Sequence, residues 1–313
     1  MKVLVTGGAG QVGSCVADEL VARGDEVLCI DNFRTGRPEH LQEHARLELR
    51  VFSVAEKSRL RTAFEDFGPD VVVHAAASYK DPDDWAEDSL TNCVGGANVV
   101  QLAREFAVDR FIYLQTSLCY GLRPPSFPIP IDYPRNPEGS SYAITKTTNE
   151  QFVELSGLDY VTFRLANVIG PRNLAGPLPI FFDRLMAGKR CFVSESRRDF
   201  VFVGDLARLI VMAADGIGSG PYHFSSGSDV SIKELYDEVV ANLGLDNIEE
   251  PETVPLGEDD TMTILLDPSK TWQDFGQFSL VPLPEIVARA GEYYRQYGAR
   301  GGVSHLKRSV QDG

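Results

Sequence analysis

The sequence is short of positive charge and of long apolar runs, and each shortage excludes a class of partner. Its 30 Lys and Arg residues face 45 Asp and Glu residues, which gives a formal net charge of −15. A protein with this balance does not attract a nucleic-acid backbone. No apolar run approaches the roughly 20 residues that span a bilayer. The short run at residues 1–6 is followed at once by glycines, which predicts a first strand rather than a signal peptide. We therefore expect neither a nucleic acid nor a membrane as partner.

Paired cysteines and metal-ligand clusters are also missing. The five cysteines contain no Cys-x-x-Cys pair, a pattern typical of small core residues in a reducing cytoplasm. They are Cys15, Cys29, Cys93, Cys119 and Cys191. His40 and His44 stand at helical spacing, but no carboxylate or thiolate set is evident to complete a zinc site. The sequence thus predicts a cytoplasmic protein without a metal.

What the chain does contain is a regular alternation of strand-like and helix-like stretches. Such alternation is typical of a parallel sheet covered by helices on both faces, and 313 residues are more than one core usually holds. We therefore predict an α/β fold with a doubly wound parallel sheet and a smaller C-terminal α/β domain. The expected strands are 3–5, 26–30, 49–52, 71–74, 111–114 and 161–165, and the expected helices are 14–23, 58–67, 91–106 and 142–155.

A glycine-rich turn follows the first expected strand. Gly7, Gly10 and Gly13 recur at three-residue spacing, and bare backbone there lets a pyrophosphate approach a helix N-terminus. Alone, the triplet is also compatible with an ordinary strand-to-helix turn. Asp31 closes the second strand about twenty residues later, where a carboxylate accepts both hydroxyls of an adenosine ribose and repels a 2′-phosphate. Together these residues predict NAD as the cofactor.

Polar side chains gather after the fifth expected strand and at the start of a later helix. Residues 115–121 follow that strand, and ligands of open α/β sheets lie beyond the carboxyl ends of the strands. Tyr142 and Lys146 are four residues apart on an expected helix, so they project from one face. A proline-rich segment, 122–137, precedes them and is expected to form a loop over the site.

The pattern changes after Asn167, where Gly-Pro pairs interrupt it. We predict a Rossmann-type, NAD-binding domain in residues 1–166 with return segments near 198–225, a mainly substrate-binding domain in residues 167–300, and a loose tail in residues 301–313. Further helices are expected at 180–187, 231–243 and 284–297. Ser231 is expected to cap one of them, and Asp205 to cap another helix that follows a strand near 197–204.

With these features in this order, the sequence resembles the extended short-chain dehydrogenase/reductase family, in its nucleotide-sugar epimerase and dehydratase branch. The resemblance covers residues 1–297, and the sequence looks like UDP-galactose 4-epimerases and sugar epimerases of bacterial surface-polysaccharide clusters. It rests on five ordered motifs: Thr-Gly-Gly-Ala-Gly-Gln-Val-Gly (6–13), Asp-Asn-Phe-Arg-Thr-Gly (31–36), His-Ala-Ala-Ala (74–77), Tyr142-x-x-x-Lys146 and Arg-Asp-Phe (198–200).

The resemblance implies three catalytic roles. Tyr142 would take the proton of a sugar hydroxyl, because an adjacent ammonium stabilises a phenolate whose reference pKa is about 10. Lys146 would lower that pKa and hold the nicotinamide ribose. Thr116 matches the hydroxyl that the family hydrogen-bonds to the reacting oxygen, with Ser117 as the fallback.

The resemblance also implies which residues bind the cofactor and the substrate. For NAD they are Gly7, Gly10, Gln11, Val12, Gly13, Asp31, Asn32, Thr35, Gly36, Ser53, Val54, Ala75, Ala76, Ala77, Asn92, Tyr142 and Lys146. For a nucleotide sugar, with UDP as the expected nucleotide, they are Ser117, Asn167, Arg198, Lys80 and Arg172. Asn167 and Arg198 match residues that contact the diphosphate, which suits a forked guanidinium. Lys80 and Arg172 lie on expected loops, where they either meet a phosphate or sugar carboxylate or stay solvated.

Departures from the family pattern bear on the substrate and the reaction. Ser53 stands where an aspartate commonly faces the adenine, and Gly257 stands where a second diphosphate-binding arginine is expected. Thr116 is followed by Ser117 and Leu118. The acid that dehydratases and uronate decarboxylases of the family carry within two positions of this hydroxyl is therefore missing. What remains is the implied activity of a UDP-sugar 4-epimerase, which oxidises C4 transiently and returns the hydride to the opposite face.

Two alternatives stay open at this point. A 4,6-dehydratase or UDP-uronate decarboxylase could take its acid from elsewhere. A non-catalytic NAD-binding regulatory protein could keep the fold without turnover, although the intact Thr116, Tyr142 and Lys146 favour an enzyme. The resemblance also implies a homodimer that pairs the helices at 91–106 and 142–155.

Overall fold

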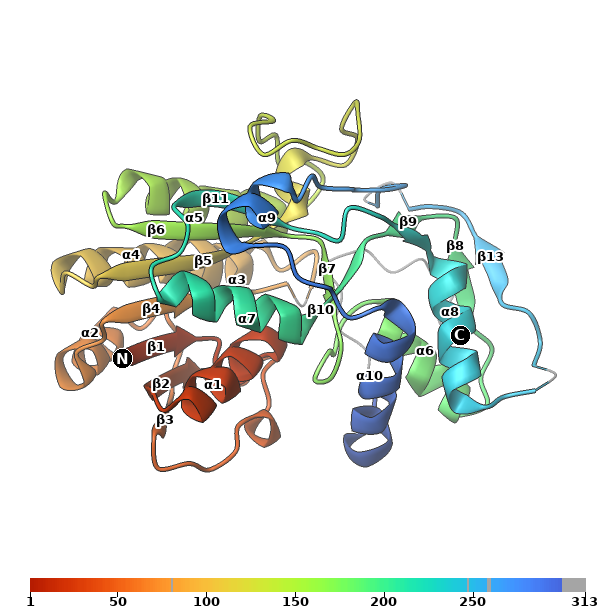
Figure 1. Cartoon of the computed structure of the whole chain (residues 1–313), viewed down its shortest axis with the longest axis horizontal. Coiled ribbons are helices and arrows are strands. Elements are labelled where there is room, and N and C mark those ends of the chain that lie inside the picture. The colour runs from red at the N-terminus through yellow and green to blue at the C-terminus, as the bar shows by residue number, and fades with distance from the viewer. Residues whose placement is uncertain (80, 247, 258–259, 300–313) are drawn as a thin grey trace.

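A computed structural model describes residues 1–79, 81–246, 248–257 and 260–299 of the protein. A seven-stranded sheet forms the larger half of the molecule (Figure 1). Every pairing within this sheet is parallel. From one edge to the other the strands are β11 (Gly220–Phe224), β6 (Tyr160–Leu165), β5 (Arg110–Thr116), β4 (Val71–His74), β1 (Lys2–Thr6), β2 (Glu26–Asp31) and β3 (Leu47–Val51).

Helices cover both faces of the sheet. Val3 and Val5 of β1 pack into a hydrophobic cluster with one set of helices, whereas Leu4 between them packs into a cluster with another set. Because successive side chains of a strand point to opposite faces, both faces are buried, as a parallel sheet requires. One face carries α1 (Gln11–Arg23) and α7 (Val203–Ala214), and the other carries α2 (Lys57–Phe67), α4 (Gly96–Glu105) and α5 (Ser141–Leu155). The predicted α/β, doubly wound arrangement is present.

The second half is smaller and has its own hydrophobic cluster. It is built on α6 (Pro177–Met186), α8 (Ile232–Leu243) and α10 (Leu283–Tyr297), which lie together on one side of Figure 1. Short strands pair beside them: β7 (Asn167–Ile169) with β10 (Phe200–Phe202), β8 (Phe192–Ser194) with β13 (Glu252–Val254), and β9 (Arg197–Arg198) with β12 (Val230–Ser231). Helix α9 (Ser269–Phe275) contacts β11.

The chain passes several times between the two halves. It leaves the sheet after β6 and returns for α7 and β11, in the region where return segments are predicted. The division into two functional domains stays a prediction, and the predicted tail at 301–313 lies outside the described residues.

Three local predictions need comment. The helix expected at 91–106 is part of a longer helical run, which comprises α3 (Trp85–Asp88), a π-helical segment η2 (Ser89–Gly95) and α4. Ser231 caps α8 as predicted, because its Oγ accepts a hydrogen bond from the Glu234 N–H in a capping box. The prediction for Asp205 is wrong. Helix α7 begins at Val203, and Asp205 in its first turn accepts the Val281 N–H at 2.8 Å instead.

Short 3₁₀ turns and irregular segments connect these elements. The turns are η1 (Pro38–His40) and η3 (Ser117–Tyr120). The predicted loop at 122–137 has no helix and no named strand, and Ile129 makes an isolated bridge to Leu266.

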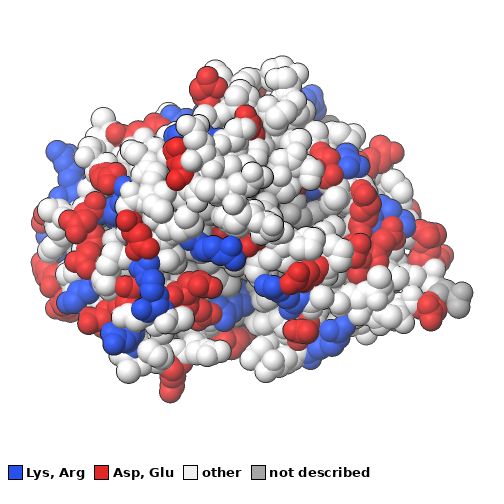
Figure 2. Space-filling view, viewed as in Figure 1, with Lys and Arg blue, Asp and Glu red and all other residues white. Residues whose placement is uncertain are grey.

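Charge and polarity of the surface agree with the composition. Figure 2 shows acidic and basic side chains interspersed over one face rather than gathered into a basic patch. None of the helices in the described ranges is long and apolar enough to cross a membrane. Within the same ranges, no three His, Cys, Asp or Glu side chains are grouped so that they could hold a metal ion.

Candidate active site

A cavity of about 680 Å³ lies at the carboxyl ends of the central strands. Its wall is formed by the turn after β1, the ends of β2, β4 and β5, the first turns of α5, and segments of the smaller half. Since the strands are parallel, these ends meet at one edge of the sheet, where α/β proteins bind their ligands. Sequence positions far apart are thereby brought into one site.

The glycine turn is required by close backbone contacts. Gly7 has a φ of +67°, and a Cβ there would lie 2.7 Å from the Ala76 nitrogen. A Cβ at Gly13 would lie 2.2 Å from the Gly7 carbonyl oxygen. Both contacts are too short for any side chain, so only glycine allows the turn to fold against β4. Gly10 precedes α1 and caps it with no side chain, so backbone N–H groups at this helix end are available to an anion in the cavity.

Asp31 is buried at the end of β2, next to this turn. Its Oδ2 accepts the Ala9 N–H at 2.9 Å, and its Oδ1 accepts the Phe33 N–H at 2.8 Å. Burial raises the pKa of this carboxyl, and the backbone hydrogen bonds act in the opposite direction. Each carboxylate oxygen keeps a further lone pair for a ribose hydroxyl. The carboxylate and the bare glycine turn fit the adenosine diphosphate half of NAD.

The other residues predicted to bind NAD divide into two groups. Lining the same cavity are Gln11, Val12, Asn32, Thr35, Ser53, Val54, Ala75, Ala76 and Ala77. Among the described lining residues, Gly36 and Asn92 do not appear. Gly36 leaves room for Asp31, because a Cβ there would lie 2.9 Å from both carboxylate oxygens. Asn92 accepts the Ser78 N–H at 2.9 Å and donates to Thr145 Oγ1 at 3.0 Å. It thereby connects the loop after β4 to α5.

Sequence reasoning missed many of the lining residues, among them Arg34, Tyr79 and Glu87. The Arg34 guanidinium lies 3.1 Å from the Glu87 carboxylate, which joins the loop after β2 to the α3 segment. The rings of Tyr79 and Tyr142 meet edge to face, with centroids 6.1 Å apart. The spacing of residues along the chain does not predict these contacts, because they depend on how each loop packs against a distant helix.

Thr116, Tyr142 and Lys146 all line the cavity. Tyr142 and Lys146 project from the start of α5, one turn apart, as their spacing predicts. Burial raises the pKa of Tyr142 above its ordinary value; Tyr79 and Asp88 act in the same direction, and a hydrogen bond with the Thr116 side chain acts against them. Burial also lowers the pKa of Lys146 to about 7, although the Glu150 carboxylate opposes this.

The Thr116 hydroxyl has a defined orientation at the end of β5. Its Oγ1 accepts the Leu118 N–H at 3.2 Å, which leaves the hydroxyl proton for donation toward Tyr142 or a ligand oxygen. Ser117, the fallback for this role, lines the cavity beside it. The Thr116 hydroxyl can therefore donate a hydrogen bond to a ligand oxygen, and the neighbouring Tyr142 hydroxyl can exchange a proton with it.

Arg198 lines the cavity from the smaller half. It donates to the Asp260 carboxylate and to the Thr261 carbonyl oxygen, which hold the guanidinium in place. Burial lowers the pKa of Arg198, and the Asp260 charge opposes this. Asn167 also lines the cavity. An anion that bound here would compete with Asp260 for the guanidinium.

The structure does not bring every predicted substrate residue to the cavity. Arg172 pairs with Asp18 at 2.7 Å and is not among the described lining residues. Lys80 lies outside the described residues. The loop at 122–137, predicted to cover the site, contributes none of the described lining residues either; Arg135 within it pairs with Glu150 behind the cavity instead.

Known proteins resemble this chain over nearly its whole length. Residues 3–224 match the model of the NAD dependent epimerase/dehydratase family. A UDP-glucose 4-epimerase from Mycolicibacterium smegmatis is 30% identical over 312 residues, which cover 94% of this chain and 99% of that protein.

Solved structures extend the resemblance to the fold. The Bordetella bronchiseptica enzyme WbmH, solved in complex with NAD+, is 59% identical, with a TM-score of 0.93 over 95% of this chain and 99% of that chain. The enzyme WbmG from the same organism, solved with NAD and UDP, is 42% identical, with a TM-score of 0.89 over 98% of this chain and 99% of that chain. The resemblance predicted from the ordered motifs is thus confirmed, and the chain belongs to the NAD-dependent epimerase/dehydratase family.

Proposed function

We propose that the protein is an NAD-dependent epimerase that inverts C4 of a UDP-sugar. One observation carries the proposal: a single cavity is lined by Asp31 and the glycine turn, by Tyr142, and by Arg198 of the smaller half. This set of residues suits a dinucleotide on the sheet, a nucleotide diphosphate held by the smaller half and a sugar at Tyr142. The relatives with UDP or UDP-glucose in their names support UDP as the nucleotide.

The chain's own residues suit proton transfer at a sugar hydroxyl. Bound NAD would accept a hydride from C4 and return it, and its cationic ring favours a phenolate nearby. Tyr142 would take the proton of the C4 hydroxyl as the hydride leaves and give it back when the hydride returns. Lys146, whose pKa of about 7 lets it be charged near neutrality, would stabilise that phenolate. Thr116 would donate its hydroxyl proton to the reacting oxygen, since its own oxygen accepts from Leu118.

The carboxylates of the cavity favour epimerisation over elimination. Among the described lining residues the carboxylates are Asp31, Glu87 and Asp260, which already accept from backbone N–H groups, Arg34 and Arg198 respectively. The positions after Thr116 are Ser117 and Leu118, so no carboxyl group directly follows the catalytic hydroxyl. An acid placed there is what a dehydratase or decarboxylase would need. Return of the hydride to the same carbon needs none.

Product analysis tests this proposal directly. The purified protein would be incubated with UDP-hexoses, UDP-N-acetylhexosamines and UDP-uronates, and the products would be identified by NMR. We expect a mixture of C4 epimers of one sugar class, with no net consumption of NAD. A keto-sugar or a decarboxylated product without any epimer would overturn the proposal.

We also propose that the protein forms a homodimer in the cytoplasm. Leu90 and Val94 of η2 and Ile144 of α5 are about half exposed, and η2 packs against α5. A second copy would cover these apolar side chains. The five cysteines are free thiols, as in a reducing compartment. A monomeric mass by light scattering at micromolar concentration would contradict the dimer.

A further inference from the structure

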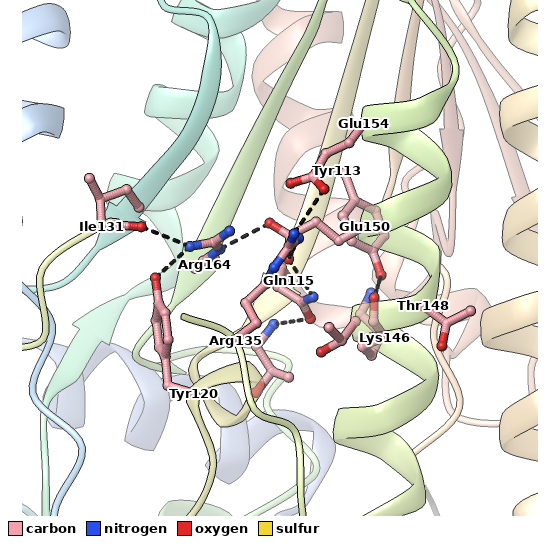
Figure 3. Close-up of polar contacts among 12 residues, drawn as sticks. Tyr113, Gln115, Tyr120, Ile131, Arg135, Lys146, Thr148, Glu150, Glu154 and Arg164 are labelled. Atoms are coloured by element: carbon pink, nitrogen blue, oxygen red, sulfur yellow. Dashed lines mark hydrogen bonds and ion pairs between the residues drawn. The ribbon is translucent and has the colours of Figure 1, made fainter. Parts of the chain in front are cut away.

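A buried cluster of charged and polar side chains lies behind the cavity (Figure 3). It consists of Glu150, Gln115, Arg164 and Arg135, with Glu154 at its outer edge. The proposed reaction gives these side chains no role. At the centre of the cluster is Glu150 of α5, whose side chain is fully buried. Its Oε1 accepts the Arg164 Nε–H at 2.9 Å. Its Oε2 accepts the Gln115 Nε2–H at 2.9 Å and lies 3.0 Å from Arg135 Nη1 in an ion pair. Two guanidinium groups thus lie against this carboxylate.

The Glu150 carboxylate determines which way the Gln115 amide points. A carboxylate only accepts hydrogen bonds, so Gln115 must present its NH₂ group to Glu150. Its Oε1 is thereby turned the other way, where it accepts the backbone N–H of Thr116 at 2.8 Å. Gln115 is 1% exposed, so no water competes for these bonds. One amide therefore links a buried charge to the residue that ends β5.

The link also relates β5 to the helix that carries the other catalytic residues. Glu150 lies one turn beyond Lys146 and two turns beyond Tyr142 on α5, so the three share a face. The Glu150–Gln115–Thr116 chain fixes the end of β5 against this face. Thr116 then holds its hydroxyl by accepting the Leu118 N–H. The position of the hydroxyl relative to Tyr142 thus depends on bonds on both sides of Thr116.

We propose that Gln115 is a positioning residue of the reaction: it transfers the fixed position of Glu150 to the Thr116 backbone and so aims the Thr116 hydroxyl at the reacting oxygen. This inference rests on the proposed function. Gln115 also lines the cavity, but its two hydrogen bonds go to Glu150 and Thr116, so their loss should slow the chemical step far more than it weakens substrate binding. Displacements of about 1 Å in a catalytic group reduce turnover by up to about a hundredfold.

The test is Gln115→Met, which keeps the length of the side chain and removes both hydrogen bonds. We expect kcat to fall about ten- to a hundredfold, while KM for the UDP-sugar and the amount of bound NAD stay within about twofold of the wild type. The matched control is Glu154→Gln. Glu154 pairs with Arg135 at the outer edge of the same cluster but has no bond toward Thr116, so its loss should leave kcat unchanged.

A double-mutant cycle separates positioning from a general structural effect. In a Thr116→Ala background, Gln115→Met should cause almost no further loss of kcat, because the hydroxyl that it aims is already gone. Full additivity of the two losses would overturn the proposal, as would a single variant with wild-type kcat. Gln115→Asn is a second variant that keeps an amide but is too short for both bonds, and it should show the same loss.

The outcomes for folding are also decisive. If both Gln115 variants lose the fold or the bound NAD, Gln115 is a structural residue and the proposal is wrong. A wild-type protein that forms no epimer contradicts the proposed function instead. The same cycle then applies to whichever Tyr142-dependent reaction the wild type catalyses, with NADH formation as the readout.

Discussion

The Nε–H of Arg164 donates to Oε1 of Glu150 at 2.9 Å, and the two side chains come from different elements, β6 and α5. Their side chains are 5% and 0% exposed. Arg164 also donates to the Tyr120 hydroxyl at 2.6 Å and to the Ile131 carbonyl oxygen at 3.0 Å. Because removal of each charge from water costs several kcal/mol, each depends on the other. The pair thereby joins the sheet, the helix that carries Tyr142 and Lys146, and the loop after β5.

Glu150→Gln should destabilise the whole protein. The substitution leaves Arg164 without a counter-charge in a buried site, whereas Arg135 keeps its ion pair with Glu154. The loss of the buried pair costs on the order of 3 kcal/mol of unfolding free energy. Urea denaturation followed by circular dichroism measures this. Glu154→Gln is the control: Glu154 is 32% exposed, and the loss of its ion pair should cost less than about 1 kcal/mol. If the two substitutions lowered the unfolding free energy equally, the buried ion pair would contribute no more to stability than the partly exposed one.

Tyr142→Phe should abolish turnover but not cofactor binding. It removes the phenolic oxygen that exchanges the proton and leaves the glycine turn and Asp31 intact, so kcat should fall about a thousandfold. The NAD content of the purified protein, read after denaturation, should equal that of the wild type. Tyr297→Phe makes the same chemical change at a 42% exposed tyrosine and should have no effect. Turnover that survives Tyr142→Phe would show that another group exchanges the proton.

Sequence reasoning succeeded where the local backbone decides the outcome. The three-residue glycine spacing predicted a turn that the contacts at Gly7 and Gly13 require. The four-residue spacing of Tyr142 and Lys146 placed them on one helix face. Strand ends meet at one edge in any parallel sheet, so Asp31, Thr116 and the segment after β4 could be assigned to one site before the fold was known.

Predictions failed where a partner distant in the chain decides a side chain's place. Asp205 has the chemistry of a cap, but its partner is Val281, 76 residues later. Arg172 suits a phosphate, yet Asp18 of α1 takes its guanidinium. The hydrogen bond between Gln115 and Glu150 joins residues 35 positions apart, and no sequence pattern around either residue predicts it. Such contacts follow from packing between elements, which local patterns do not encode.

Arg198→Ala should weaken binding of the nucleotide sugar and leave the chemical step almost intact. The guanidinium in the smaller half would donate charge-assisted bonds to the diphosphate, so KM should rise about ten- to a hundredfold while kcat changes little. Arg197→Ala is a neighbouring control, because Arg197 is 44% exposed and pairs with Asp229. A similar rise of KM in both variants would mean that general surface charge, rather than the Arg198 site, attracts the substrate.

His223 should make the protein less stable in acid. Its Nε2 lies 2.6 Å from the Tyr120 hydroxyl and its Nδ1 lies 2.9 Å from the Asp267 carbonyl oxygen. The Tyr120 oxygen already accepts from Arg164, so the Tyr120 hydroxyl donates to Nε2 and Nδ1–H donates to Asp267. That arrangement requires a neutral imidazole. Burial lowers the pKa of His223 from 6.5 to about 4, the Asp267 hydrogen bond acts against this, and the Arg164 charge adds to it.

Between those two pKa values the unfolded chain binds a proton at His223 and the folded protein does not. The unfolding free energy therefore falls as the pH falls from 6.5 toward about 4, with a slope of up to about 1.4 kcal/mol per pH unit from this residue. His223→Gln, which cannot take up the proton, should lower stability at neutral pH but flatten that slope in urea titrations. His44→Gln changes an exposed histidine and should keep the wild-type slope. An unchanged slope in His223→Gln would mean that other groups cause the loss of stability in acid.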